Sequence, residues 1–157
     1  MRYQDQVVKL TQRALDDICR SALSVPADKL EWIPLGKARS VLNQMQEIAT
    51  SATWFIPLVE SGVVPVFDQE IKDNHTRFRA QMSHIDECIG EAQQSTGQLC
   101  QAIIAFPDSS LDVEVELPFG SGKTTMADVL AMHYWNMVYH LGQINLIQLM
   151  LGDSKMH

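Results

Sequence analysis

Four polar residues near the carboxyl end of the chain have the spacing of one helix face. Their separations are three, four and three, and an α-helix returns to almost the same face every seven residues. They are His133, Asn136, His140 and Gln143. Apolar residues surround this strip, which predicts a helix buried on several sides: Leu130, Tyr134, Met137, Val138, Leu141, Ile144 and Ile147. Buried imidazoles and amides need partners, and a metal ion or a ligand satisfies several at once.

A second polar strip lies in residues 36–60, again with steps of three and four. Its members are Ser40, Asn43, Glu47, Thr50 and Trp54. If the two strips face each other, Glu47 supplies an anionic oxygen and the later segment supplies imidazole nitrogens. This mixed set suits zinc, nickel, iron or manganese. The sequence therefore predicts a divalent metal held by Glu47, by His140 and by either His133 or Asn136.

The same residues admit a second interpretation, without a metal. A single buried histidine is more often a hydrogen-bonded core residue than a ligand, and an asparagine is a poor ligand for a transition metal. Hydrogen bonds among Glu47, Asn136 and His140 would then close the strip. The protein would be a ligand-binding or interaction module instead of a metalloenzyme.

The apolar periodicity predicts four helices, over residues 4–23, 36–60, 83–105 and 125–151. Gly62 marks the end of the second helix, and Thr125 with Asp128 forms a capping pattern at the start of the fourth. A short helix is expected over 68–77 in the weakly patterned connector. Alternation over 111–117, followed by turn residues 118–122, predicts a small hairpin. The expected fold is a single all-α domain, residues 1–157, built as a four-helix bundle with a β-hairpin before the last helix.

Composition excludes several classes of function. A net charge of −7, without a cluster of Lys and Arg, disfavours nucleic acid and anionic membranes as partners. Residues 129–152 lack Asp, Glu, Lys and Arg but contain too many polar groups for a membrane span. No signal peptide is evident at the start, so we expect a cytoplasmic protein. The cysteines, which form no close-spaced motif, indicate neither a disulfide framework nor a thiolate zinc site: Cys19, Cys88 and Cys100.

Residues 120–125, Gly-Ser-Gly-Lys-Thr-Thr, look like the end of a phosphate-binding loop. That loop needs a glycine five positions before its Gly-Lys pair, and Leu117 stands there. It also needs a buried parallel strand in front of it. We interpret the segment as a turn that leads into a capped helix.

Three parts of the chain resemble the DinB-like proteins. Residues 139–144, Tyr-His-Leu-Gly-Gln-Ile, are similar to their His-x-Gly-Gln signature. Leu30, Trp32 and Pro34, followed by Ser40 and Val41, resemble the segment leading into their second helix. Residues 118–120, Pro-Phe-Gly, resemble the turn before their last helix.

The resemblance implies a four-helix bundle and a divalent metal held by three histidines, one on the second helix and two, spaced by four, on the last. Here those positions are Glu47, Asn136 and His140, with His133 one turn earlier as a substitute. Some relatives are transferases or isomerases that use a low-molecular-weight thiol, whose pKa the metal would lower. The implied activity is a metal-dependent transferase or hydrolase acting on a small molecule.

Two further expectations concern the surroundings of the site. Gln143 and Tyr139, on the same helix as His140, are expected to orient the metal ligands through hydrogen bonds. The apolar surface of this helix exceeds what one small core needs, so we expect it to form a homodimer contact.

Overall fold

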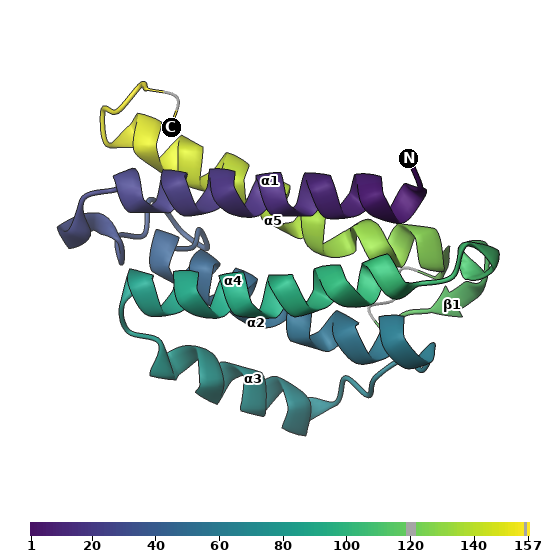
Figure 1. Cartoon of the computed structure of the whole chain (residues 1–157). Helices are drawn as coiled ribbons and strands as arrows, with labels where there is room; N and C mark the ends of the chain where they lie inside the picture. The colour runs from purple at the N-terminus through teal and green to yellow at the C-terminus, as the bar shows by residue number, and fades with distance from the viewer. Residues whose placement is uncertain (119–121, 156) are drawn as a thin grey trace.

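Four long helices build the molecule, and each follows the apolar periodicity of its sequence. They are α1 (Tyr3–Ser24), α2 (Val41–Ser61), α4 (Ile85–Ala105) and α5 (Met126–Met150). The structure, a computed structural model, describes residues 1–118, 122–155 and 157. Helix α1 packs on α5 and α4, and α2 packs on the same two helices, so the four close into a ring around one core (Figure 1). The predicted all-α bundle is confirmed.

The ends of the helices follow the local chemistry. Ser40 caps α2, because its hydroxyl accepts a hydrogen bond from the backbone nitrogen of Asn43 at 3.2 Å. Gly62 ends α2 with φ of 70°, a left-handed conformation that favours glycine. Thr125 and Asp128 form the predicted capping box at the start of α5. Capping residues therefore fix both ends of α2 and the start of α5.

Helix α3 (Gln69–Gln81) is longer than the helix predicted for residues 68–77, and it lies outside the ring of four (Figure 1). None of its residues is buried, and its contacts are mainly with α2. Asp68 caps it by accepting a hydrogen bond from the backbone nitrogen of Ile71 at 3.0 Å. The apolar pattern is weak here because α3 covers the bundle without entering its core.

The predicted hairpin is present but shorter than residues 111–117. Strand β1 (Glu114–Glu116) pairs antiparallel with β2 (Lys123–Thr125), which continues directly into α5. Residues 119–121 of the expected turn, and with them part of the Gly-Ser-Gly-Lys segment, lie outside the described residues. The antiparallel pairing differs from the parallel strand that a phosphate-binding loop follows.

The core divides into two clusters along the bundle. One contains Ile18, Met45 and Met137, and the other contains Leu58, Leu99 and Leu130. The three cysteines are buried and form no disulfide. Within the described part of the chain, no helix has the length and apolar character needed to cross a membrane.

Candidate functional site

Glu47 of α2 and His140 of α5 meet inside the bundle. Glu47 Oε1 lies 3.2 Å from His140 Nε2. The histidine side chain is 2% exposed and the glutamate side chain 25% exposed. The structure thus brings a carboxylate of the second long helix and an imidazole of the last within hydrogen-bond distance.

The other nitrogen of His140 faces Gln44, one turn before Glu47 on α2. His140 Nδ1 lies 3.1 Å from Gln44 Oε1. The amide nitrogen of Gln44 donates to the backbone oxygen of Arg39 at 3.2 Å, which sets the orientation of the amide. Nδ1 therefore donates and Oε1 accepts. Gln44 is buried and holds the imidazole ring in place.

Two arginines approach the second oxygen of Glu47. Arg39 Nη1 donates a hydrogen bond to Glu47 Oε2, and Arg79 Nη1 lies 3.9 Å from the same oxygen. Arg39 is itself held by Asn43, through Nε to Oδ1 at 2.6 Å and Nη2 to the backbone oxygen at 3.0 Å. The hydrogen bond to His140 and the hydrogen bond and charge of Arg39 outweigh burial and lower the pKa of Glu47 to about 2. The group is an anion engaged on both oxygens.

Arg79 ties α3 to α2. Its Nε donates to Thr50 Oγ1 at 2.8 Å, and the arginine side chain is 30% exposed. Burial, together with the nearby charge of Arg39, lowers its pKa, although the charge of Glu47 opposes the change. Helix α2 begins at Val41 and not at residue 36 as predicted, so Arg39 precedes it, and Arg79 lies on α3. Sequence reasoning missed both arginines because neither belongs to a polar strip.

His133 points to different partners. Its Nε2 lies 2.8 Å from Thr96 Oγ1 of α4, and its Nδ1 lies 3.1 Å from Ser51 Oγ of α2. The side chain is 1% exposed, and burial lowers the pKa of His133 to about 4. Each ring nitrogen already has a hydroxyl partner. The structure thus places this imidazole in a separate network from Glu47 and His140.

The remaining predicted residues also lie away from the carboxylate. Asn136 Nδ2 donates to Ser51 Oγ at 3.4 Å, so this amide belongs with His133. Tyr139 is 54% exposed, and its ring meets the His140 ring edge-on with centroids 5.3 Å apart. The side chain of Gln143 makes no hydrogen bond to a described residue. Gln44 takes the orienting position that was predicted for Gln143 and Tyr139.

These surroundings fit a transition metal poorly. Across residues 1–118, 122–155 and 157, no group of three or more His, Cys, Asp and Glu side chains could hold a metal ion. Of the predicted ligands, all of which lie in the described part of the chain, only Glu47 and His140 come together, and Arg39 and Arg79 set two positive charges against this carboxylate. A positive charge beside a carboxylate offsets its attraction for a cation.

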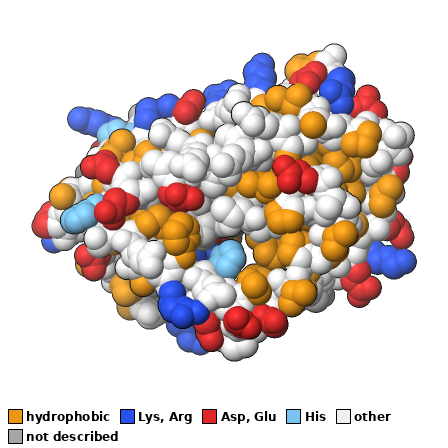
Figure 2. Space-filling view, turned by 60° about the horizontal axis from the view of Figure 1, so that its bottom comes forward, with side chains coloured by type: hydrophobic (Ala, Val, Ile, Leu, Met, Phe, Trp, Pro, Cys, Tyr) orange, Lys and Arg blue, Asp and Glu red, His pale blue; other side chains and the backbone are white. Residues whose placement is uncertain are grey.

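A cavity of about 680 Å³ opens beside this network. Helix α3 forms one wall with His75 and Arg79, and α2 and α5 supply the rest: Glu47, Ser51, Trp54, Phe55, Asp128, Ala131, Met132, Trp135 and Asn136. Phe67, from the connector before α3, completes the lining. On the side of the molecule drawn in Figure 2, patches of hydrophobic side chains lie between acidic and basic ones. The site therefore combines aromatic surface with a few charged groups.

Two further residues of this cavity carry no signal in the apolar periodicity. Trp135 is 66% exposed and stacks on Tyr139 with ring centroids 5.7 Å apart. His75 of α3 lines the cavity, and burial and the charge of Arg79 lower its pKa. Helix α3 packs on α2 and creates a wall that periodicity does not reveal.

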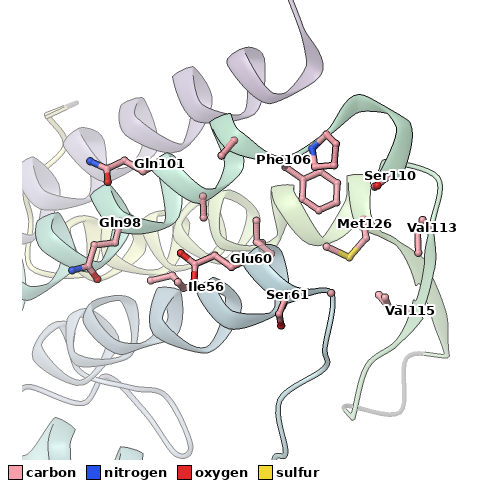
Figure 3. Close-up of a pocket in the computed structure, with 15 residues that line it drawn as sticks. Ile56, Glu60, Ser61, Gln98, Gln101, Phe106, Ser110, Val113, Val115 and Met126 are labelled. Carbon is pink, nitrogen blue, oxygen red and sulfur yellow. The ribbon is translucent and has the colours of Figure 1, made fainter.

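A second cavity, of about 740 Å³, lies between the ends of α2 and α4, the hairpin and the start of α5. Figure 3 shows Phe106 and Met126 at its inner end, with Glu60 of α2 and Gln98 of α4 along its sides. Glu60 is the one charged residue among its described lining residues. This second cavity contains none of the residues predicted from sequence.

Comparisons with solved structures identify the architecture. YfiT from Bacillus subtilis, described as a probable metal-dependent hydrolase with an unusual four-helix bundle topology, superposes with a TM-score of 0.78 at 11% identity. The match covers 96% of this chain and 89% of YfiT. The fold is DinB-like. No protein-family model and no curated protein matches the sequence.

A mycothiol-dependent maleylpyruvate isomerase has the same DinB-like bundle. It superposes with a TM-score of 0.71 at 13% identity, over 90% of this chain and 60% of the isomerase. A mutant of that isomerase superposes with a TM-score of 0.67 at 12% identity, with the same coverage. At 11–13% identity the likeness shows the fold alone. The chemistry of the site must be inferred from the residues that form it.

Proposed function

We propose that this DinB-like chain binds a small organic molecule in the cavity beside Glu47 and His140, without a transition metal at that pair. The contact of Arg39 with Glu47 Oε2 carries the proposal, since it leaves only Oε1 to face His140 and sets a positive charge beside the carboxylate, and Arg79 adds a second positive charge. Of the three positions at which the resemblance implies histidines, only His140 carries one.

Glu47 and His140 could be satisfied either by other protein groups or by a metal ion. With the network intact, each ring nitrogen of His140 faces a side-chain oxygen, and each oxygen of Glu47 faces a side-chain nitrogen. A divalent ion would have to break the contact between Glu47 and His140 and to lie near two guanidinium groups. Removing one partner from a buried charged network typically costs several kcal/mol. The network of protein groups therefore supports metal-free binding.

A second candidate is the metal-dependent hydrolase or thiol-using transferase that the sequence suggested. The hydrogen bond from His140 Nδ1 to Gln44 favours it, because a histidine ligand usually donates its other nitrogen to an oxygen acceptor. Under this proposal Glu47 and His140 hold zinc, nickel, iron or manganese, and either Asn136 or His133 completes the set. The metal would lower the pKa of a bound low-molecular-weight thiol.

The two candidates differ in how metals affect thermal unfolding. For metal-free binding, a chelator such as EDTA leaves the Tm of tag-free protein unchanged, and added Zn²⁺ or Ni²⁺ at micromolar concentration does not raise it. For a metalloenzyme, a bound ion stabilises the native state, so the chelator lowers the Tm by several degrees. If the chelator lowers the Tm of the wild type but not that of Glu47→Ala, the first proposal is wrong.

A further inference from the structure

We infer that the cavity beside α3 selects an organic anion, a carboxylate or sulfonate on an aromatic or aliphatic body, and that Arg79 binds its charged group. This inference rests on the proposed binding of a small molecule in that cavity. It adds the chemical class of the ligand and the residue that distinguishes a charged ligand from a neutral one.

Arg79 has hydrogen-bond donors that no described residue uses. Its Nε donates to Thr50 Oγ1 at 2.8 Å, while its Nη1 lies 3.9 Å from Glu47 Oε2, beyond hydrogen-bond distance. Its Nη2 has no hydrogen bond to any described residue. A guanidinium presents its donors in a planar fork that fits a carboxylate or sulfonate. The hydrogen bond to Thr50 holds the Nε side of the guanidinium and leaves Nη2 available at the cavity wall.

Two guanidinium groups share the carboxylate of Glu47. Arg39 takes its Oε2 by a hydrogen bond, and Arg79 Nη1 remains 3.9 Å from the same oxygen. Asp128, the other acid in the lining, accepts hydrogen bonds from the hydroxyls of Thr124 and Thr125 at 3.1 and 2.9 Å and forms no ion pair with Arg79. Arg79 therefore has no carboxylate oxygen within hydrogen-bond distance among the described residues. A partly desolvated cation gains most from an anionic partner.

The rest of the lining of this cavity is mainly aromatic and apolar. Trp54, Phe55, Met132 and Trp135 give the cavity a largely aromatic and apolar surface. The ring of Trp54 meets that of Phe55 edge-on at 5.1 Å between centroids. Such surfaces bind flat hydrophobic groups. A ligand with an apolar body and one anionic group therefore matches both the wall and Arg79.

The second cavity provides an internal comparison. Its described lining contains the carboxylate of Glu60 and no Lys, Arg or His (Figure 3). An anion has no positive partner there. Ligand charge should therefore distinguish the two cavities of the same molecule.

The test uses two dyes with the same aromatic body, titrated into the folded protein. One is 8-anilinonaphthalene-1-sulfonate, which carries an anion, and the other is N-phenyl-1-naphthylamine, which is neutral. We expect Arg79→Gln to weaken binding of the sulfonate at least tenfold, which corresponds to about 1.4 kcal/mol, and to change binding of the neutral dye less than twofold. Arg77→Gln is the matched control, since Arg77 lies on the same helix and is hydrogen-bonded to Asn74. This variant should change the affinity for neither dye.

Two further variants locate the dye. Ala131→Phe narrows the cavity beside α3, and Ala102→Phe narrows the second cavity. We expect only Ala131→Phe to weaken binding of both dyes. Arg79→Lys, which keeps the charge and loses the fork, should give intermediate affinity for the sulfonate. Circular dichroism and urea unfolding verify that each variant is folded.

The outcomes separate the two proposals. If Arg79→Gln and Arg79→Lys bind the sulfonate as tightly as the wild type while Ala131→Phe still weakens both dyes, the anion assignment is wrong and binding in this cavity stands. If neither dye binds the wild type, or if only Ala102→Phe weakens them, the proposed function fails together with the inference.

Discussion

Glu47 Oε1 lies 3.2 Å from His140 Nε2, and this contact joins α2 to α5 at the level of the cavity. The same carboxylate receives a hydrogen bond from Arg39, and the same imidazole faces Gln44. These four side chains, from α2, from α5 and from the segment before α2, form one continuous network. Because each polar group has a hydrogen-bonding partner within the network, Glu47 and His140 can remain inside the bundle without a metal ion.

Replacing Glu47 should destabilise the fold. In Glu47→Gln the buried His140 loses an anionic acceptor, and Arg39 and Arg79 are left near each other without a compensating charge. We expect a loss of about 1–3 kcal/mol in the free energy of unfolding, measured with urea. Glu60→Gln on the same helix is the control, because Glu60 is exposed and has no ion pair with a described residue. Equal stability of the two variants would show that the network contributes little.

Acid should remove the contribution of Glu47. The pKa of Glu47 is lowered in the folded state from 4.5 to about 2, so the unfolded state binds the proton more tightly. The stabilisation is complete above pH 4.5 and is lost as the pH falls toward 2. The difference in unfolding free energy between wild type and Glu47→Gln should therefore shrink across this interval, by about 2 kcal/mol. A difference that stays constant with pH would contradict the assigned ion pairs.

His133 should contribute a separate dependence on pH. Burial lowers the pKa of His133 in the folded state from 6.5 to about 4, so its contribution is complete above pH 6.5 and falls as the pH drops to 4. We expect the wild type to lose up to about 3 kcal/mol over this range relative to His133→Gln. His84→Gln, at the exposed start of α4, should keep the wild-type profile. An unchanged slope in His133→Gln would mean that this imidazole is not buried between Thr96 and Ser51.

The exposed apolar face of α5 predicts a homodimer. Its members lie on one side of the helix at spacings of three and four and are 41–66% exposed: Trp135, Val138, Tyr139, Leu146, Leu149 and Met150. The face has no charged residue to repel its copy in a symmetric contact. Sedimentation should give a dimer for the wild type and a monomer for Leu146→Glu. Val113→Glu, at an exposed apolar position that is not part of this face, should remain dimeric. A monomeric wild type would refute the prediction.

The fold could be predicted from the sequence because its main signals are local. The apolar periodicity, Gly62 and the capping pair Thr125 and Asp128 fix helix ends without knowledge of long-range contacts. Helix α3 was predicted too short, because its stability depends on tethers such as the contact of Arg79 with Thr50. Periodicity indicates which faces are apolar but not which polar helix covers them.

The candidate site was predicted in part, for a related reason. Helical spacing placed His133, Asn136 and His140 on one strip, and all three do face inward or toward a neighbouring helix. Residues of one polar strip can nevertheless contact different helices at different points along its length. His133 reaches Thr96 of α4, whereas His140, two turns later, reaches Glu47 of α2. Gln44 could have been found, since it lies three residues before Glu47. Arg39 and Arg79 depend on tertiary contacts that the spacing does not encode.

Elemental analysis of tag-free protein, purified without chelator, decides whether Glu47 and His140 hold a metal ion. We expect well under one tenth of a divalent ion per chain for zinc, nickel, iron and manganese, with no difference between wild type and Glu47→Ala. Close to one ion per chain in the wild type, lost in Glu47→Ala, would contradict this expectation and establish the pair of Glu47 and His140 as a metal site.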